Sequence, residues 1–426
     1  MTVTSPPIAP PSHASLTVPQ GAALSIGAVL GTGVISLPAL AADLAGPASL
    51  LAWFALVLLS VPLAATFAAL GARYPDGGGV STYARRAFGR RAAAVVGWCF
   101  YFAVPVGAPA AAMFAGHYVA DVLGGGARTA LATAMAITLV VGVANYFGIR
   151  VSGRLQLGLA SVLILLLVAA TVAALPYADL GNLRPFAPHG WAAVGSAAAL
   201  LVWAFAGWEA VSSLAADYRR PARDLPRATA VTVVVVGVLY LAIAATSILV
   251  LGSAAGSSAA PLSDLLTLGV GGPVREITAV VAVLLTMGAM NAYFAGAAKL
   301  GAALGRDGAL PAWFASGSAA GEIPRRSLLA FGGLALVALT AFGVLDLDVE
   351  VSVLVTTGSF SLVYVLGCAA AVRLLPRGTW AHRCAVVALV AVTGLLVLTG
   401  VYVVWALAVA AAALAYDAYA NRGRRT

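Results

Sequence analysis

The sequence predicts an all-α integral membrane protein with about twelve transmembrane helices. Hydrophobic residues make up 62% of the 426 residues and charged residues only 9%. A soluble core cannot absorb that share of apolar surface, so the lipid bilayer must solvate most of the chain. Apolar runs of about 20 residues, the length that crosses the hydrocarbon layer, recur from one end to the other. Basic residues lie in alternate loops between these runs, which is typical of multi-pass membrane proteins.

Each apolar run defines one predicted span. In chain order the spans are Gly21–Ala42, Ser49–Leu70, Ala92–Ala120, Thr129–Tyr146, Leu155–Leu175, Trp191–Ala215, Ala228–Leu251, Val274–Leu300, Ser327–Phe342, Val351–Val372, Cys384–Leu398 and Val401–Tyr419. The last two share one continuous apolar stretch, so a single long tilted helix is the alternative there. Residues 1–19, rich in Pro and Ser, are predicted to be a disordered cytoplasmic tail, and 421–426 a basic one.

The basic residues test the number and direction of the spans. If the N-terminus is cytoplasmic, the loops on the cytoplasmic side hold 21 of the 24 Lys and Arg residues. Only Arg128, Arg184 and Arg275 then fall outside. A wrong number of spans would scramble this alternation. The positive-inside rule therefore predicts a multi-pass protein of the cytoplasmic (inner) cell membrane with both termini in the cytoplasm.

Two spans carry interruptions at matching positions. Span one contains "GTGVIS" (Gly31–Ser36), and span six contains "VWAFAGWEA" (Val202–Ala210), where Gly207 and Glu209 interrupt an apolar helix. These positions are equivalent if spans one to five (20–175) and six to ten (191–372) are two repeats, followed by two additional helices (381–420). Breaks at equivalent places in two halves are typical of transporters built from inverted repeats.

Unwound backbone suits an amino acid as a ligand. The N–H groups that a break frees must face protein or a watery cavity, and they gather the positive end of the next helix dipole, which favours a carboxylate. The carbonyl groups that end the preceding helix favour an ammonium group. For Gly31 and Gly33 alone, close helix packing is the alternative explanation.

The charged residues restrict the ligand. Of the fifteen acidic residues, Glu209 is the one that we place clearly inside a span. It is a candidate proton carrier, and its alternative is a structural role as an acceptor for freed N–H groups. The remaining candidate lining is neutral: Tyr101, Trp203, Phe205, Trp208, Met287, Asn291 and Tyr293. This set favours a small neutral, apolar amino acid.

Other classes of function lack the residues that they need. Cys99, Cys368 and Cys384 lie far apart in apolar segments, and the four histidines show no HExxH spacing, so we expect no metal and no cofactor. The net charge of +9 follows the loops and forms no basic face for nucleic acid. A membrane-embedded enzyme would need a catalytic cluster, and a channel a continuous polar path. The sequence favours neither.

The motifs together resemble the amino acid–polyamine–organocation (APC) superfamily of transporters. The similar stretches are "LGTGVISLPALAA" in span one, "ARYPDGGGVSTYARRAFG" after span two, "GWCFYFAVPVGAPAA" in span three, "WAFAGWEAVSSLAADYRRPARDLPRA" in span six and its loop, and "MNAYFAGAAKLGAALGRDG" in span eight. The "VPVGAPAA" stretch and the short chain are most similar to the bacterial exporters of methionine and branched-chain amino acids. The resemblance implies a LeuT/APC-like fold, a five-plus-five inverted repeat with helices one and six broken.

The resemblance also implies roles for individual residues. The substrate carboxylate would be held by the hydroxyl and N–H of Thr32 and the N–H groups of Gly33 and Val34. Backbone carbonyl groups would hold the ammonium group. An aromatic ring would close the site, and further candidate residues would lie beside it. These are Val29, Trp203 and Ala206 for the carbonyls, Phe205 for the ring, and Gly31, Gly207 and Asn291 as the further candidates.

The implied activity is secondary active transport by alternating access. The substrate would be a small neutral amino acid such as methionine, leucine, isoleucine or valine, and the leading mode is export by proton antiport. An uptake permease or exchanger is the alternative. Several relatives carry a lysine in span five, and Leu155–Leu175 has none. Protons, sodium, exchange and facilitated diffusion therefore stay open as the coupling mode, as do monomer and homodimer.

Overall fold

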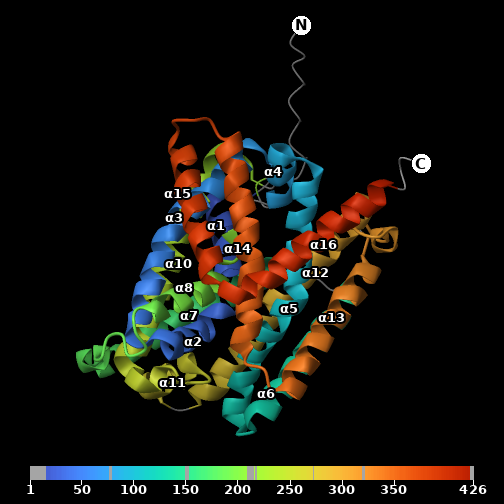
Figure 1. Ribbon diagram of the computed structural model, residues 1–426. Coiled ribbons are helices and arrows are strands. Elements are labelled where there is room, and N and C mark those ends of the chain that lie inside the picture. The colour runs from blue at the N-terminus through green and yellow to red at the C-terminus, as the bar shows by residue number, and fades with distance from the viewer. Residues whose placement is uncertain are drawn as a thin grey trace.

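The computed structural model describes residues 16–75, 79–148, 153–208, 215, 218–271, 273–318 and 322–422. It is a bundle of long helices (Figure 1). The helices are α1 (Val18–Leu30), α2 (Leu37–Ala45), α3 (Ser49–Arg73), α4 (Gly79–Phe88), α5 (Arg90–Leu123), α6 (Gly126–Tyr146), α7 (Gly153–Ala174), α8 (Ala192–Phe205), α10 (Pro221–Leu251), α11 (Pro261–Val270), α12 (Val274–Arg306), α13 (Arg325–Leu345), α14 (Val349–Leu374), α15 (Trp380–Leu398) and α16 (Val403–Arg422).

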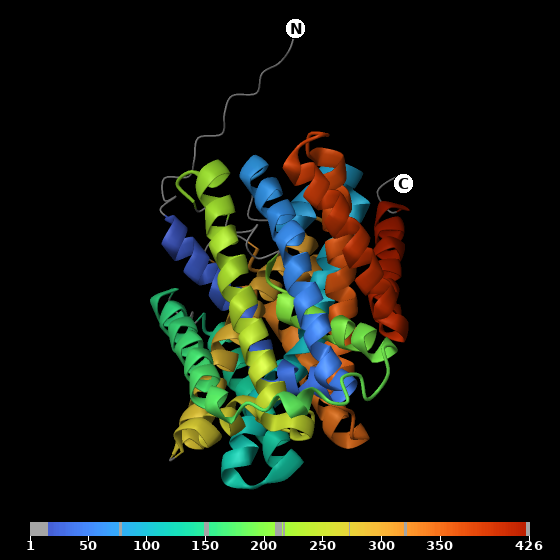
Figure 2. The ribbon, with the colours of Figure 1, turned by 90° about the vertical axis from the view of Figure 1, so that its left-hand side faces the viewer.

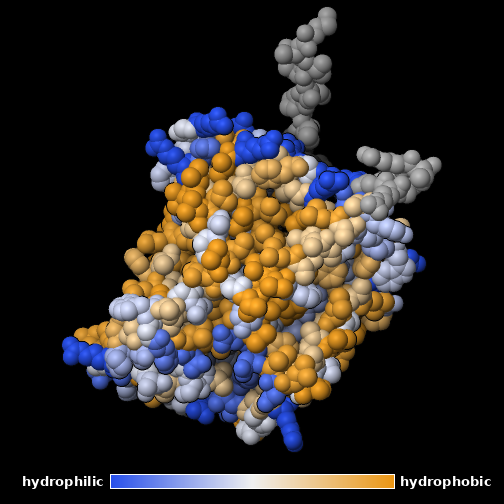
Figure 3. All heavy atoms as spheres, viewed as in Figure 1, coloured by the Kyte–Doolittle hydropathy of each residue, from blue (hydrophilic) through white to orange (hydrophobic). Residues whose placement is uncertain are grey.

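The helices confirm the predicted class. Within the described residues, ten helical segments are long and apolar enough to cross a membrane, one of them comprising α2 and α3. Shorter apolar helices, among them α1 and α8, belong to spans one and six, and every predicted span coincides with one or two helices. Apolar side chains form a broad band across the face shown in Figure 3, with hydrophilic residues gathered toward the two ends of the bundle. This is the surface that a bilayer requires.

The last apolar stretch forms two helices instead of one. The 3-10 turn Gly400–Tyr402 separates α15 from α16, and Gly400 has a φ of +60°, a conformation that favours glycine. The structure therefore selects the first of the two alternatives for this region.

The structure differs from the prediction in where helices begin and in two additional short helices. Helix α10 begins at Pro221, seven residues before the predicted Ala228, since proline fits the first turn of a helix. Helices α4 and α11 lie in segments that we read as loops, because ten-residue helices are too short to show as spans. The interpretation of Glu209 as the one acidic residue clearly inside a span was too narrow. Asp417 lies on α16 and is 4% exposed, with Arg90 and Arg91 as its ion-pair partners.

The packing repeats itself after a shift of five spans. Helix α1 packs on α10. Five spans later, the equivalent helix α8 packs on α3, which is the equivalent of α10. Helices α3 and α10 also pack on each other, at the front of Figure 2. Helix α5 packs on α14, and its counterpart α12 packs on α7. The short helix α4 packs on α14, and α11, at the opposite face, packs on α7. These matching neighbours are what two inverted repeats predict, and the repeat bounds 20–175 and 191–372 remain a prediction.

Candidate functional site

Span one is broken where the sequence predicted. Helix α1 ends at Leu30, Gly31 takes a φ of +43°, and a short 3-10 turn (η1) covers Gly33–Ile35 before α2 begins. Pro38 is the second residue of α2, where its missing N–H costs no helical hydrogen bond. The break thus depends on a glycine that adopts a positive φ and on a proline in the first turn of the next helix.

Span six is also broken, and its break lies against the end of α1. Helix α8 ends at Phe205, Ala206 is extended, and Gly207 has a φ of +130°. A Cβ atom added at Gly207 would lie 3.1 Å from the Ala28 carbonyl oxygen and 3.2 Å from the Val29 Cα. The two breaks therefore touch backbone to backbone, and glycine is required at Gly207 for this approach.

A cavity of ≈ 70 Å³ lies at the two breaks. Its walls come from α1 and the turn after it, from α5, from α8, from α12 and from α14. The lining residues are Ala28, Val29, Gly31, Thr32, Gly33, Ala103, Val104, Gly107, Ala108, Ala111, Trp203, Ala206, Ala289, Met290, Tyr293, Phe294, Thr356 and Phe360. Among these described residues none carries a charge.

Six of the residues singled out from the sequence line this cavity together. They are Val29, Gly31, Thr32, Gly33, Trp203 and Ala206. Tyr293, named as candidate lining, is also in the wall. The structure thus gathers residues from two segments that are more than 160 positions apart in the chain around one small space.

Other candidates lie elsewhere. Val34 is 1% exposed and packs in the core behind the cavity wall. Gly207 contacts α1 but does not line the cavity. The side chain of Phe205 and the whole of Glu209 lie outside the described residues.

Asn291 has a partner of its own. The Nδ2 atom of Asn145 on α6 donates a hydrogen bond of 2.7 Å to its Oδ1 atom, so this amide joins two helices. Its neighbour Met290 lines the cavity instead. Asn291 is therefore a helix-packing residue in this structure, not part of the cavity wall.

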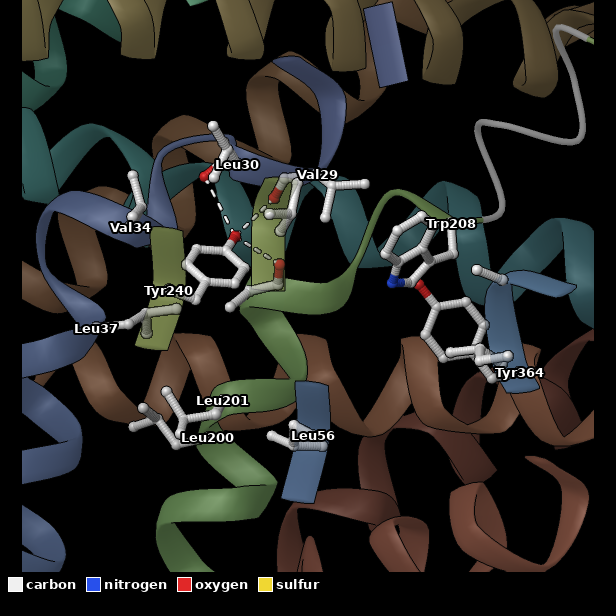
Figure 4. Close-up of a cluster of buried hydrophobic side chains, with 14 of the residues drawn as sticks. Val29, Leu30, Val34, Leu37, Leu56, Leu200, Leu201, Trp208, Tyr240 and Tyr364 are labelled. Atoms are coloured by element: carbon white, nitrogen blue, oxygen red, sulfur yellow. Dashed lines mark hydrogen bonds between the residues drawn. The ribbon is translucent and has the colours of Figure 1, made fainter. Parts of the chain in front are cut away.

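Three further residues of the candidate lining also do not line the cavity. The Tyr101 hydroxyl donates to the Ser327 carbonyl oxygen at 3.0 Å. Met287 is partly buried in the cluster beside α13. Trp208 is 1% exposed and lies beside Tyr364 in the core (Figure 4).

Tyr240, which sequence reasoning did not single out, joins the two breaks. The Tyr240 hydroxyl on α10 lies 2.8 Å from the Val29 carbonyl oxygen and 2.7 Å from that of Ala204, with Leu30 at 3.5 Å (Figure 4). These carbonyls belong to the C-terminal ends of α1 and α8. A phenol has one proton to donate, so the two close carbonyls share a single donor.

The far wall of the cavity was also missed. On α5 it consists of small residues, and a Cβ atom added at Gly107 would lie 3.0 Å from Thr356 Cγ2 and 3.1 Å from Trp203 Cη2. Thr356 is 2% exposed, and its hydroxyl has no hydrogen-bond partner within the described residues. The available signal was "VPVGAPAA", whose small residues mark a helix face that leaves room for another group.

The break gives the cavity two electrostatic poles. The carbonyl ends of α1 and α8 supply negative partial charge, and the N–H groups at the start of η1 and α2 supply positive partial charge. A zwitterion can be bound between such poles without a charged side chain. The apolar walls formed by Met290, Phe294 and Phe360 suit an apolar substituent.

Comparisons with known proteins identify the family of the chain. The family model for amino acid permeases matches residues 16–419. The chain is 32% identical to YecA, described as an uncharacterised amino acid permease of Bacillus subtilis, over 87% of this chain and 88% of the relative. It is 30% identical to the L-methionine/branched-chain amino acid exporter YjeH of Escherichia coli, over 84% and 86%.

A further relative covers half of the chain. The branched-chain amino acid permease BcaP of Bacillus subtilis is 28% identical over 52% of each protein. Since the family model spans almost the whole chain and two relatives of at least 30% identity cover most of it, the chain belongs to the amino acid permease family of the APC superfamily.

Proposed function

We propose that this permease exports small neutral, apolar L-amino acids across the cytoplasmic membrane by alternating access. The observation that carries the proposal is the cavity at the two breaks, with backbone poles of opposite sign and no charged residue in its described wall. A lysine, arginine or glutamate substrate would bury a charge there without a partner, which is costly. Methionine, leucine, isoleucine and valine carry no such charge.

The binding mode follows from the poles. Thr32 and the N–H groups of Gly33 and Val34 hold the carboxylate group. The carbonyls of Val29, Trp203 and Ala206 hold the ammonium group. The apolar side chain points toward α5, α12 and α14, where Gly107 leaves the room for it.

The direction of transport rests on similarity. YjeH is named an exporter and matches over most of its length, which favours export. BcaP is named a permease, so uptake or exchange is the second candidate. Proton antiport is the proposed coupling, with Glu209 as its candidate carrier. The names of the relatives favour a transporter over an enzyme.

The test is efflux from proteoliposomes that contain the purified protein. Radiolabelled leucine or methionine is loaded inside, and its release is followed with and without an imposed pH gradient. We expect release of both, faster when protons can move in exchange. A release rate that is the same with and without the pH gradient would reject proton coupling. If neither amino acid is released, the proposed substrates are rejected.

A further inference from the structure

The hydroxyl group of Tyr118 links the break of span one to helix α11. Tyr118 lies on α5 and is 1% exposed. Its hydroxyl donates to the Ile35 carbonyl oxygen at 2.6 Å and accepts from the Leu262 N–H at 3.2 Å. A single buried oxygen thus bonds to the 3-10 turn η1 on one side and to the start of α11 on the other.

The two hydrogen-bond partners of Tyr118 lie next to the proposed carboxylate site and at the start of α11. Ile35 ends η1, directly after Gly33 and Val34, whose N–H groups belong to the proposed carboxylate site. Leu262 is the second residue of α11, and because Pro261 has no N–H, the N–H of Leu262 is the first that the helix offers. Movement of η1 therefore changes the geometry of the bond that holds the start of α11.

Helix α11 has a second attachment that does not reach the break. The Arg275 guanidinium lies 3.8 Å from Asp121 and 4.0 Å from Asp264 of α11. The Arg275 side chain is 46% exposed, so these ion pairs are weak. The two attachments can be separated by experiment, because only Tyr118 contacts η1.

The opposite face has a similar short helix, α4. Helix α4, near the chain termini, is held by an ion pair of 3.0 Å between Arg85 and Asp307 at the end of α12. Both side chains are partly exposed, and neither lines the cavity. Within the described residues, the buried hydroxyl that joins η1 to a covering helix lies at the α11 face.

We propose that Tyr118 is a positioning residue that couples closure of α11 to occupancy of the span-one break. This inference rests on the proposed function. A substrate carboxylate bound to the N–H groups of Gly33 and Val34 holds η1 in its 3-10 form. The Ile35 carbonyl is then held in place as the acceptor of the Tyr118 hydroxyl. Because a hydroxyl that donates a hydrogen bond becomes a better acceptor, the bond that Tyr118 accepts from the Leu262 N–H is strengthened. Substrate binding in this way closes the face opposite the termini, which is the outer face in the proposed orientation.

Thiol labelling of α11 tests the proposal. Ser263 lies on the inner side of α11 and is 0% exposed, so Ser263→Cys reports opening of this helix. The reporter is placed in a background in which Cys99, Cys368 and Cys384 are alanine. A membrane-impermeant maleimide is then added to proteoliposomes, with and without leucine, and the initial labelling rate is measured.

We expect three patterns. In the parent, leucine slows labelling. Tyr118→Phe raises the leucine-free rate about fivefold, the value of one buried hydrogen bond, and removes the effect of leucine. Arg275→Gln also raises the leucine-free rate, yet leucine still slows labelling because the link to η1 is intact.

Tyr101→Phe is the matched control. It removes another buried hydroxyl from α5, one that bonds to Ser327 and touches neither η1 nor α11, so its labelling should equal that of the parent. Tyr118→Phe labelling that stays at the parent rate, or that leucine still slows, would overturn the proposal. If leucine leaves the parent rate unchanged, the efflux assay decides: leucine efflux then rejects only the coupling, and no efflux rejects the proposed function as well.

Discussion

The Tyr240 hydroxyl lies 2.8 Å from the carbonyl oxygen of Val29, at the point where α1 stops. The same hydroxyl is 2.7 Å from the Ala204 carbonyl near the end of α8. One side chain from α10 thus holds together the two helix ends that form the negative pole of the cavity. The proposed ammonium site includes the Val29 carbonyl, so a bound ammonium group would share that carbonyl with this hydroxyl.

Tyr240→Phe should reduce transport by roughly tenfold. The change leaves buried carbonyls without this donor, at a cost of about 1–3 kcal/mol, and the pole loses its fixed shape. Initial rates of leucine efflux at several concentrations measure the effect. Tyr101→Phe, which removes a buried hydroxyl that bonds to the Ser327 carbonyl and does not line the cavity, should keep the parent rate. An unchanged leucine affinity in Tyr240→Phe would contradict this role.

Gly33→Val should abolish transport while the protein still inserts. A Cβ atom at Gly33 would lie 2.7 Å from Leu37 Cδ1 and 2.8 Å from Trp203 Cδ1. The end of the Leu37 side chain can move, but the indole ring of Trp203 lines the cavity and would fill it if it shifted. Gly296→Val on α12 is the control, since a Cβ there meets nothing within 4 Å. Efflux and gel filtration of both variants are compared, and normal efflux by Gly33→Val would reject the site.

Backbone features of the site could be predicted from the sequence because they depend on residue type alone. Gly31 and Gly207 have φ values of +43° and +130°, which favour glycine, so their presence inside apolar runs was informative. The spans were predictable for a similar reason, since the hydrophobic length and the loop arginines are set by the bilayer.

The side chains that complete the cavity could not be predicted in this way. In a membrane helix the lipid face and the protein face are both apolar, so hydropathy does not tell which side of α5 or α14 faces inward. Tyr240 and Thr356 stayed hidden for that reason. Asn291 was selected because a polar residue in a span is expected to face a ligand; its Oδ1 atom accepts a hydrogen bond from Asn145, and its part in substrate binding stays a prediction.

Asp417→Asn should lower the thermal stability of the detergent-purified protein. The Asp417 side chain is 6% exposed and lies 3.0 Å from Arg90 and 3.3 Å from Arg91, so the substitution removes the ion pairs that both guanidinium groups make with it. Both arginines are about half exposed or more, which reduces the cost from that of a buried pair to about 1–3 kcal/mol. Asp307→Asn, in a more exposed pair, should shift the melting temperature less. Equal shifts would show that burial of Asp417 is irrelevant.

Glu209→Gln should separate proton coupling from substrate binding. Glu209 lies outside the described residues, and the prediction follows from its place directly after the break of span six. If its carboxyl group carries the proton, the amide variant keeps leucine exchange but loses the acceleration by a pH gradient. Exchange and net efflux are measured on the same proteoliposomes. Net efflux with an unchanged response to pH would remove Glu209 from the proton pathway and leave it a structural role.

Gly107→Ala should shift the preference of the transporter toward smaller side chains. The new methyl group would lie 3.0–3.1 Å from Thr356 and Trp203, closer than ordinary contact, and would take space from the apolar end of the cavity. Such a change of one carbon in an apolar pocket alters discrimination by about 10- to 200-fold. Leucine and methionine efflux should therefore fall much more than valine efflux in competition assays. The double variant Gly107→Ala with Thr356→Ala tests the cause, because removing the threonine side chain returns room next to the methyl group. Partial recovery of leucine efflux is expected, whereas equal losses for all three amino acids without recovery would mean that the substrate side chain does not lie against α5.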